Sequence, residues 1–151
     1  MSKKVYIFLA DGFEDIEGLT VVDLMRRAGI DIGTDFSDAD MLVLPGGMPG
    51  TKYLGEYQPL CDLLRDFYGK SGKVAAICAA PTVLASLGFL GGRKATAYPS
   101  CMEGLTGAEP SYESVVVDGN VTTSRGLGTA VDFALSLIGQ LLGEEKADEI
   151  A

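Results

Sequence analysis

Cys78 is the residue whose surroundings best suit nucleophilic chemistry. It follows the apolar run 74–77 and precedes Ala79, Ala80 and Pro81. A strand ending at a cysteine, with small residues leading into a helix, is typical of a nucleophile elbow, in which a sharp turn projects the side chain. A helix N-terminus just beyond the sulfur favours the thiolate, so the pattern predicts a thiol pKa below that of an ordinary cysteine. The alternative is a core cysteine, because free cysteines are among the most buried residues.

Gly46 and Gly47 offer backbone N–H groups in a turn after the apolar run 41–44. Together with the N–H group of Ala79, they are candidates for an oxyanion hole. The alternative is an ordinary turn in which glycine supplies a positive φ angle, and the glycines alone favour that interpretation.

Glu17 is the candidate acid or base. It lies early in a predicted helix, where Glu14 and Asp15 crowd the same turn. Acidic residues at this position commonly stabilise a helix N-terminus, so the spacing alone favours a structural role.

Apolar runs that alternate with helical patterns are expected to position these residues. The runs at 5–10, 41–44 and 74–77 are apolar throughout, which indicates strands buried on both faces of a parallel sheet. Ligands bind such sheets at the carboxyl ends of the strands, where Cys78 and the two glycines lie. The remaining predicted elements are helices at 14–28, 59–68, 81–87 and 128–142, a short strand at 94–98, and a hairpin of strands 114–118 and 121–124.

The composition excludes several classes of function. The chain of 151 residues is the size of one domain, and residues 1–151 are expected to form a single one. It contains no histidine, so catalytic machinery built on histidine is excluded, and no metal site is expected. A net charge of −9 argues against nucleic acid and membrane partners. Three scattered cysteines without a secretion signal indicate a cytoplasmic, reducing compartment.

Four segments together resemble the ThiJ/PfpI family of the class I glutamine amidotransferase-like superfamily. They read DGFEDIEGLTVVDLMRRAGI, LVLPGGMPGTKYL, VAAICAAPTVLASLGFLGGRKATAYP and TTSRGLGTAVDFAL, and they look most like the branch of the parkinsonism-associated protein deglycase. The resemblance implies an α/β flavodoxin-like sandwich with a mostly parallel central sheet and helices on both faces.

The resemblance also implies the roles of the site residues. Cys78 matches the family nucleophile, and Glu17 matches a glutamate that hydrogen-bonds its sulfur. Backbone groups that match Gly47 and Ala79 form the family oxyanion pocket, with Gly46 in the same turn. Arg125 matches a position close to the site.

This chain departs from its relatives in two ways. Tyr98 stands where many relatives have a histidine near the cysteine, and Ala79 stands where the protease-like branch has one, which weakens a peptidase interpretation. The segment between Ile30 and Asp35 is short, because relatives carry a further strand and hairpin there. That stretch is on the order of 30 residues in relatives, whereas a βαβ crossover needs only ~10–12 residues, so the chain can still connect its strands without it. The first strand is then expected to lie at the sheet edge, unless residues are missing from the sequence at this join.

Two functions remain open. One is a cofactor-independent, cysteine-dependent glyoxalase or deglycase that acts on small aldehydes such as methylglyoxal. The other is a redox-responsive stress protein or chaperone whose cysteine is oxidised to sulfinate. The family resemblance also implies a link to thiamine biosynthesis, without choosing among these functions. A homodimer is expected, although the hairpin missing here contributes to the dimer contact in relatives. Cys61 is interpreted as structural, and Cys101 as structural or as a resolving thiol.

Overall fold

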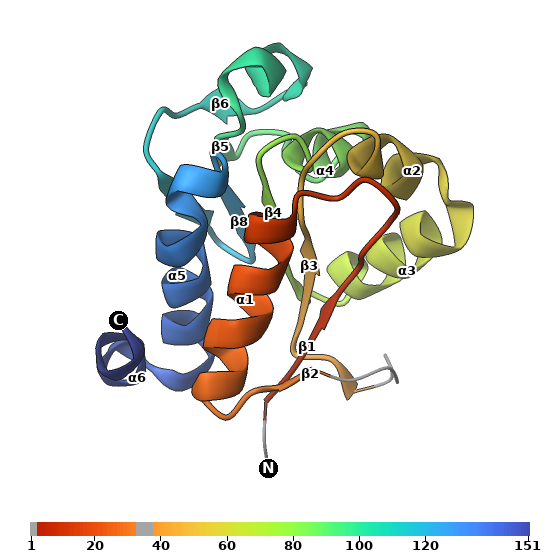
Figure 1. Cartoon of the computed structure of the whole chain (residues 1–151). Coiled ribbons are helices and arrows are strands. Elements are labelled where there is room, and N and C mark those ends of the chain that lie inside the picture. Colours follow the sequence, from red (N-terminus) through yellow and green to blue (C-terminus); the bar gives the residue numbers. More distant parts are fainter. Residues whose placement is uncertain (1–2, 33–37) are drawn as a thin grey trace.

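A six-stranded sheet runs through the centre of the molecule (Figure 1). The structure is a computed structural model, and it describes residues 3–32 and 38–151. The strands of the sheet are β1 (Lys4–Ile7), β2 (Asp31–Ile32), β3 (Met41–Leu44), β4 (Lys73–Ile77), β7 (Val115–Asp118) and β8 (Val121–Ser124). They follow the order β2-β1-β3-β4-β8-β7, and only the β7–β8 pair is antiparallel. Two short strands, β5 (Lys94–Ala95) and β6 (Glu109–Pro110), form a separate parallel pair.

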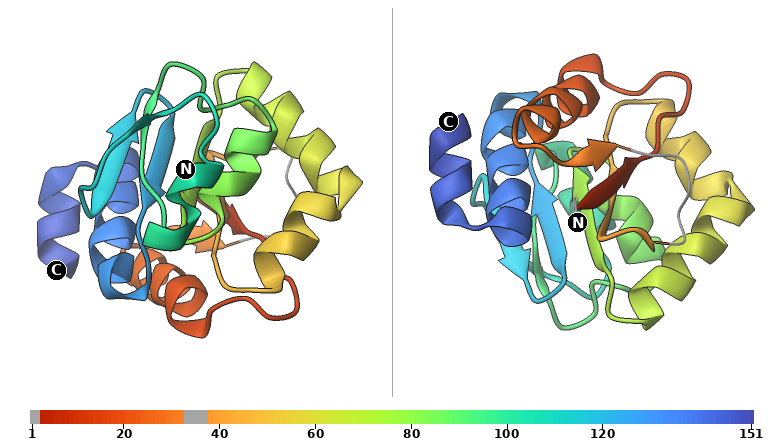
Figure 2. Two further views of the ribbon diagram at one scale, coloured as in Figure 1. Left: turned by 90° about the horizontal axis from the view of Figure 1, so that it is seen from above. Right: turned by 90° about the horizontal axis from the view of Figure 1, so that it is seen from below.

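Helices cover both faces of the sheet (Figures 1 and 2). One face carries α1 (Asp15–Arg27) and α5 (Ala130–Leu142), and α6 (Glu144–Ile150) packs against α5. The other face carries α2 (Gly50–Glu56), α3 (Gln58–Gly69) and α4 (Pro81–Ser86). Two 3-10 helices, at Pro99–Gly104 and Leu127–Thr129, lie in the connections. Among the described residues, no helix has the length and apolarity needed to cross a membrane.

The central strands are buried on both sides because their residues alternate between two cores. In β3, Leu42 and Leu44 pack into the core beneath α2, α3 and α4, whereas Met41 and Val43 pack into the core beneath α1 and α5. This alternation is why the run is apolar throughout, and the predicted parallel sheet between two helical layers is confirmed.

The first strand is not the edge of the sheet, contrary to the sequence-based expectation. The two residues of β2 pair with the start of β1, Lys4 with Asp31 and Val5 with Ile32. The chain therefore retains a rudimentary edge strand after α1, because two residues suffice to pair in parallel with β1. Residues 33–35 of the short join lie outside the described residues.

Several predicted boundaries also differ from the structure. The first strand ends at Ile7 rather than at residue 10, and the predicted strand 94–98 is reduced to β5. Helix α2 was not predicted, because Pro49, Gly50 and Gly55 give its segment the composition of a loop.

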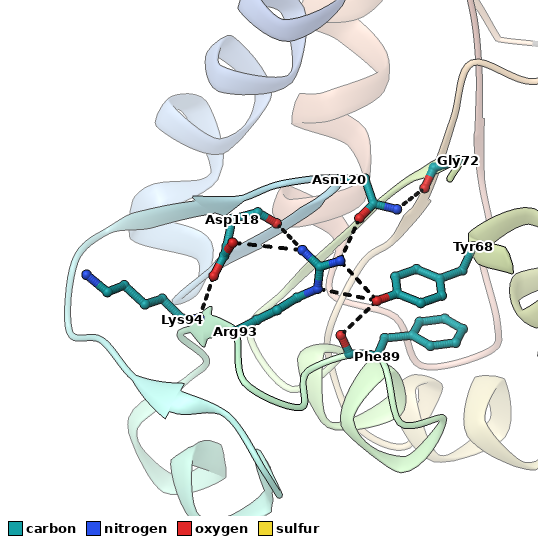
Figure 3. Close-up of polar contacts among 7 residues, drawn as sticks. All are labelled: Tyr68, Gly72, Phe89, Arg93, Lys94, Asp118 and Asn120. Carbon is teal, nitrogen blue, oxygen red and sulfur yellow. Dashed lines mark hydrogen bonds and ion pairs between the residues drawn. The ribbon is translucent and has the colours of Figure 1, made fainter. Parts of the chain in front are cut away.

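Arg93 joins the β7–β8 hairpin to α3 (Figure 3). Its guanidinium donates hydrogen bonds to the Tyr68 hydroxyl at 3.1 and 3.3 Å, to the Asp118 carbonyl at 2.9 Å and to the Asn120 side chain at 3.0 Å. The Tyr68 ring stacks on Phe89 with 4.0 Å between centroids. These contacts fix the hairpin from which β8 runs towards Cys78.

Candidate active site

Cys78 lies in a strained turn between β4 and α4. Its φ angle is +66°, a left-handed conformation that is uncommon for residues other than glycine and costs energy. Both of its backbone polar groups are held, because its N–H donates to the Ser124 carbonyl at 3.0 Å and its carbonyl accepts from the Tyr98 N–H at 2.8 Å. The predicted elbow is therefore present, and the thiol is only half-buried, unlike that of a core cysteine.

Glu17 projects from the first turns of α1 into the protein and is only 1% exposed. Its Oε2 atom accepts a hydrogen bond of 2.9 Å from the Gly46 N–H. Its carboxyl also interacts with the Cys78 thiol, and this interaction shifts the pKa of both groups. Apart from the contact of the carboxyl with the sulfur, Oε1 has no hydrogen-bond partner among the described residues. Glu17 thus points towards Cys78. A residue that only stabilised the helix N-terminus would point to solvent instead.

Neither Gly46 nor Gly47 leaves room for a side chain. A Cβ atom on Gly46 would lie 2.6 Å from both the Cys78 Cβ and the Glu17 Oε2. Gly47 has a φ angle of +91°, and a Cβ atom there would lie 2.4 Å from the Glu14 backbone nitrogen. Glycine at 46 therefore lets the end of β3 approach both the Cys78 side chain and the Glu17 carboxyl.

The oxyanion assignment needs one correction. The Gly46 N–H is engaged with the Glu17 carboxyl, so it does not face a substrate oxygen. The N–H groups of Gly47 and Ala79 instead act on the Cys78 sulfur, and they lower the pKa of its thiol. The donor set near the sulfur is therefore these two groups, and Gly46 acts by orienting Glu17.

The protonation behaviour of the pair corrects the sequence-based expectation for Cys78. Burial raises the pKa of the Cys78 thiol, the negative charge and hydrogen bond of Glu17 raise it further, and the backbone N–H groups of Ala79 and Gly47 only partly oppose them, so the pKa is about 12. Burial likewise raises the pKa of Glu17, against the lowering effect of its bonds to Cys78 and Gly46. The prediction of a depressed thiol pKa was wrong because it weighed the helix N-terminus and left out desolvation. The Glu17 carboxyl lies beside the thiol, where it is placed to exchange a proton with the sulfur.

A pocket of about 440 Å³ opens above the thiol. It brings together the predicted residues Cys78, Glu17, Tyr98 and Arg125. The residues that complete its lining are Glu14, Pro99, Tyr112, Ser114, Gly126, Leu127, Gly128 and Thr129. A cavity of about 620 Å³ elsewhere is lined by residues such as Lys3 and Lys73 and by no cysteine, so we place the chemistry in the smaller pocket.

Arg125 and Tyr112 form one wall of the pocket. The Arg125 Nε donates to the Ala97 carbonyl at 3.3 Å, and the guanidinium carbon lies 5.7 Å from the centre of the Tyr112 ring. Tyr112 was not predicted, since it comes from an irregular loop after β6 with no motif around it. An aromatic residue between two polar turn residues was the only signal for it.

The other cysteines lie outside this pocket. Cys61 is buried in α3, and its sulfur approaches the Gly55 carbonyl at 3.5 Å, which fits the predicted structural role. Cys101 packs against the core beneath α4 and does not line the pocket, so the geometry gives no support to a resolving thiol. Within residues 3–32 and 38–151, no cluster of three acidic, cysteine or histidine ligands could hold a metal ion.

Comparisons with known proteins match the chain along its whole length. "Protein dj-1beta" of Drosophila melanogaster is 39% identical over 180 aligned positions, covering 100% of this chain and 96% of that protein. The alignment is 29 positions longer than the 151 residues of this chain, in line with the expected shortening. The "Parkinson disease protein 7 homolog" of Danio rerio is 33% identical, covering 98% of this chain and 94% of that protein.

Solved structures of similar proteins also match the chain along almost its whole length. The crystal structure of Drosophila melanogaster DJ-1beta matches with a TM-score of 0.93 and 37% identity, covering 100% of this chain and 96% of that one. The structure of Toxoplasma gondii DJ-1, described as oxidized, matches with a TM-score of 0.94 and 30% identity, covering 99% and 96%. The family model described as the DJ-1/PfpI family matches residues 34–140, more than half of the sequence. The chain is therefore a member of the DJ-1/PfpI family, in its DJ-1 branch.

Proposed function

We propose that this chain is a cofactor-independent cysteine enzyme of the glyoxalase or deglycase type, which converts small 2-oxoaldehydes into 2-hydroxy acids. The observation that carries the proposal is the contact between a half-buried thiol on a strained turn and a carboxylate that is almost fully buried. The pair opens onto a small pocket, and its relatives share its fold and family. Methylglyoxal is the simplest substrate of this class.

The first step is addition of the Cys78 sulfur to the aldehyde carbon. Because the thiol pKa is high, the sulfur is protonated at neutral pH and needs a base. The carboxylate of Glu17 takes the thiol proton as the carbon–sulfur bond forms and then gives it to the former aldehyde oxygen, which yields a hemithioacetal and restores the carboxylate. The Gly47 and Ala79 N–H groups lie near the sulfur, where the developing oxyanion would form.

The second step moves one proton between neighbouring carbons. Glu17 removes the proton from the carbon bound to sulfur, and the electron pair shifts to the adjacent carbonyl oxygen to form an enediolate. The hydroxyl proton of the hemithioacetal moves to this second oxygen. Glu17 then returns the carbon proton to the second carbon, which gives a thioester with a neighbouring hydroxyl group. Water then cleaves the thioester, which releases the 2-hydroxy acid and restores the thiol. The net reaction converts one 2-oxoaldehyde and one water into one 2-hydroxy acid, and no external oxidant or reductant is needed.

The test is turnover of methylglyoxal without glutathione. Purified protein should produce lactate, detected by NMR or by an enzymatic lactate assay. Cys78→Ser should abolish the product, whereas Cys101→Ser, which alters a thiol outside the pocket, should retain activity. Absence of lactate from the wild-type protein would reject the proposal.

A second candidate is redox sensing through oxidation of Cys78 to a sulfinate. The N–H groups of Gly47 and Ala79 favour it, because they could donate hydrogen bonds to the new oxygens, and a protonated Glu17 could donate one more. A related protein from Toxoplasma gondii has been described in an oxidized form. A stress-responsive or chaperone role would require this oxidation to alter a surface. It predicts modification of Cys78 by peroxide without turnover of aldehydes.

We extend the proposal to assembly and compartment. A homodimer is supported by Ile16 and Leu19, large apolar side chains exposed side by side on α1. The free thiols fit a reducing, cytoplasmic compartment. Light scattering of the purified protein tests the dimer, and a monomeric mass at micromolar concentration would reject it.

A further inference from the structure

The pocket above Cys78 has an aromatic and aliphatic side that the proposed chemistry does not use. Tyr98, Pro99, Tyr112 and Leu127 line it, whereas the reacting groups lie at the Cys78 end. None of these four side chains is needed for addition to the aldehyde or for transfer of the proton by Glu17. They are therefore available to bind a part of the substrate that does not react.

The two tyrosine rings are accessible to a ligand. Tyr98 is 49% exposed and Tyr112 is 69% exposed, so a bound group would cover surface that now faces water. The Tyr98 ring is held near the site, because its own backbone N–H bonds the Cys78 carbonyl at 2.8 Å. The ring lies close to the Gly126 turn, because a Cβ atom added to Gly126 would lie 3.4 Å from the Tyr98 Cδ2 atom.

Tyr112 is positioned by a charge. The Arg125 guanidinium carbon lies 5.7 Å from the ring centre, and Arg125 is itself tied to the Ala97 carbonyl. A cation of this kind over a ring face restrains the ring orientation. The wall therefore presents a flat aromatic surface at a defined place relative to the sulfur.

The size of the pocket exceeds what the smallest substrate needs. Its volume of about 440 Å³ lies in the range of ~300–1,000 Å³ that is typical of sites for larger organic ligands. Methylglyoxal carries only a methyl group beyond its two carbonyls and would leave the aromatic wall uncovered. Binding energy from a remote substituent can be used to accelerate the reaction at the reacting carbon.

We propose that the site selects 2-oxoaldehydes whose ketone carbon carries a flat, apolar substituent, such as an aryl group, and that Tyr112 is the residue that sets this preference. The inference rests on the proposed aldehyde chemistry and adds the class of substrate. The aryl group stacks against Tyr112, with Tyr98 and Leu127 beside it, while the aldehyde carbon reaches Cys78. Phenylglyoxal is the probe, and the same addition, proton transfer and hydrolysis convert it with one water into mandelate.

The experiment compares kcat/KM for phenylglyoxal and methylglyoxal in four proteins, from initial rates before dicarbonyls modify arginine side chains. The proteins are the wild type, Tyr112→Ala, Tyr112→Phe and a control, Tyr57→Ala. Tyr57 is a tyrosine of similar exposure, 62%, which lines a different cavity. Because loss of one aromatic contact changes affinity by a few-fold to about tenfold, Tyr112→Ala should lower the phenylglyoxal to methylglyoxal ratio about five- to tenfold. Tyr112→Phe and Tyr57→Ala should keep the wild-type ratio.

The outcomes separate the two levels of the proposal. An unchanged ratio in Tyr112→Ala, with methylglyoxal turned over normally, would overturn the substrate class and leave the aldehyde chemistry standing. A fall of the same size in Tyr57→Ala would show a general effect of tyrosine removal and would also overturn it. Failure of the wild type to convert either aldehyde would reject the proposed function, and the substrate class with it.

Discussion

Replacement of Glu17 by glutamine isolates the electrostatic coupling at the site. The Cys78 thiol has a pKa of about 12 against an ordinary value of 9.0, and burial is the largest cause. The negative charge of Glu17 and its hydrogen bond are the second and third causes, and glutamine removes the charge while keeping the shape. A neighbouring charge commonly shifts a pKa by about 1–3 units. We therefore expect the thiol pKa in Glu17→Gln to fall by about one unit or more, ~1.4 kcal/mol per unit, and to remain above the ordinary value because burial persists.

The assay is the rate of alkylation of Cys78 by iodoacetamide as a function of pH, resolved by peptide mass spectrometry. Site resolution matters because Cys101 is also partly accessible. The midpoint of the Glu17→Gln profile should lie at lower pH than that of the wild type. A midpoint that stays in place or moves upward would refute the coupling between Glu17 and the thiol.

Four further predictions follow from the same contacts. Gly46→Ala places a methyl group 2.6 Å from the Cys78 Cβ, so calorimetry should show a melting temperature lowered by several degrees, and an unchanged value would contradict the packing. Arg93→Ala removes four hydrogen bonds and should cost about 2–4 kcal/mol in urea unfolding, whereas Arg65→Ala, from an exposed ion pair, should cost under about 1 kcal/mol. Burial raises the pKa of Glu17 in the folded protein, so the stability that its protonated form contributes at low pH is lost as the pH rises through this raised pKa. The melting temperature of Glu17→Gln should therefore exceed that of the wild type at pH 8, and the difference should shrink towards pH 4.5; a difference that does not change with pH would contradict the raised pKa. Peroxide should convert Cys78 mainly to sulfinate in the wild type and towards sulfenate or mixed disulfides in Glu17→Gln, and identical masses in the two proteins would remove the role of Glu17 in oxidation.

The sheet was predictable from sequence because each buried strand is a short, uninterrupted apolar run. A run such as 41–44, apolar at every position, can only be buried on both faces, and that indicates a parallel sheet between helices. The short strand β2 was not predictable, because two residues carry no periodic pattern. Helix α2 was missed since its glycines and proline read as a loop, although tertiary packing makes it helical.

The site was predictable in part. The elbow at Cys78 followed from a strand meeting a helix through small residues, but Glu17 was assigned through family resemblance, since its spacing alone suggested a helix cap. The engagement of Gly46 with Glu17 and the raised pKa of the thiol depend on packing and desolvation, which the order of residues does not reveal. Tyr112 reaches the pocket from an irregular loop, where no helical or strand periodicity in the sequence indicates which way its side chain points.

The central claim is that Cys78 bonds covalently to the aldehyde and that Glu17 drives the later proton transfer. Rapid-quench mass spectrometry of the protein mixed with methylglyoxal tests both parts directly. The wild type should show an adduct of one methylglyoxal on the Cys78 peptide, which disappears as lactate forms. Glu17→Gln should form the adduct more slowly, because the thiol has lost its base, and should release no lactate from the adduct that forms, whereas Cys78→Ser should give neither adduct nor lactate. Lactate released by Cys78→Ser, or an adduct confined to Cys101, would contradict the account.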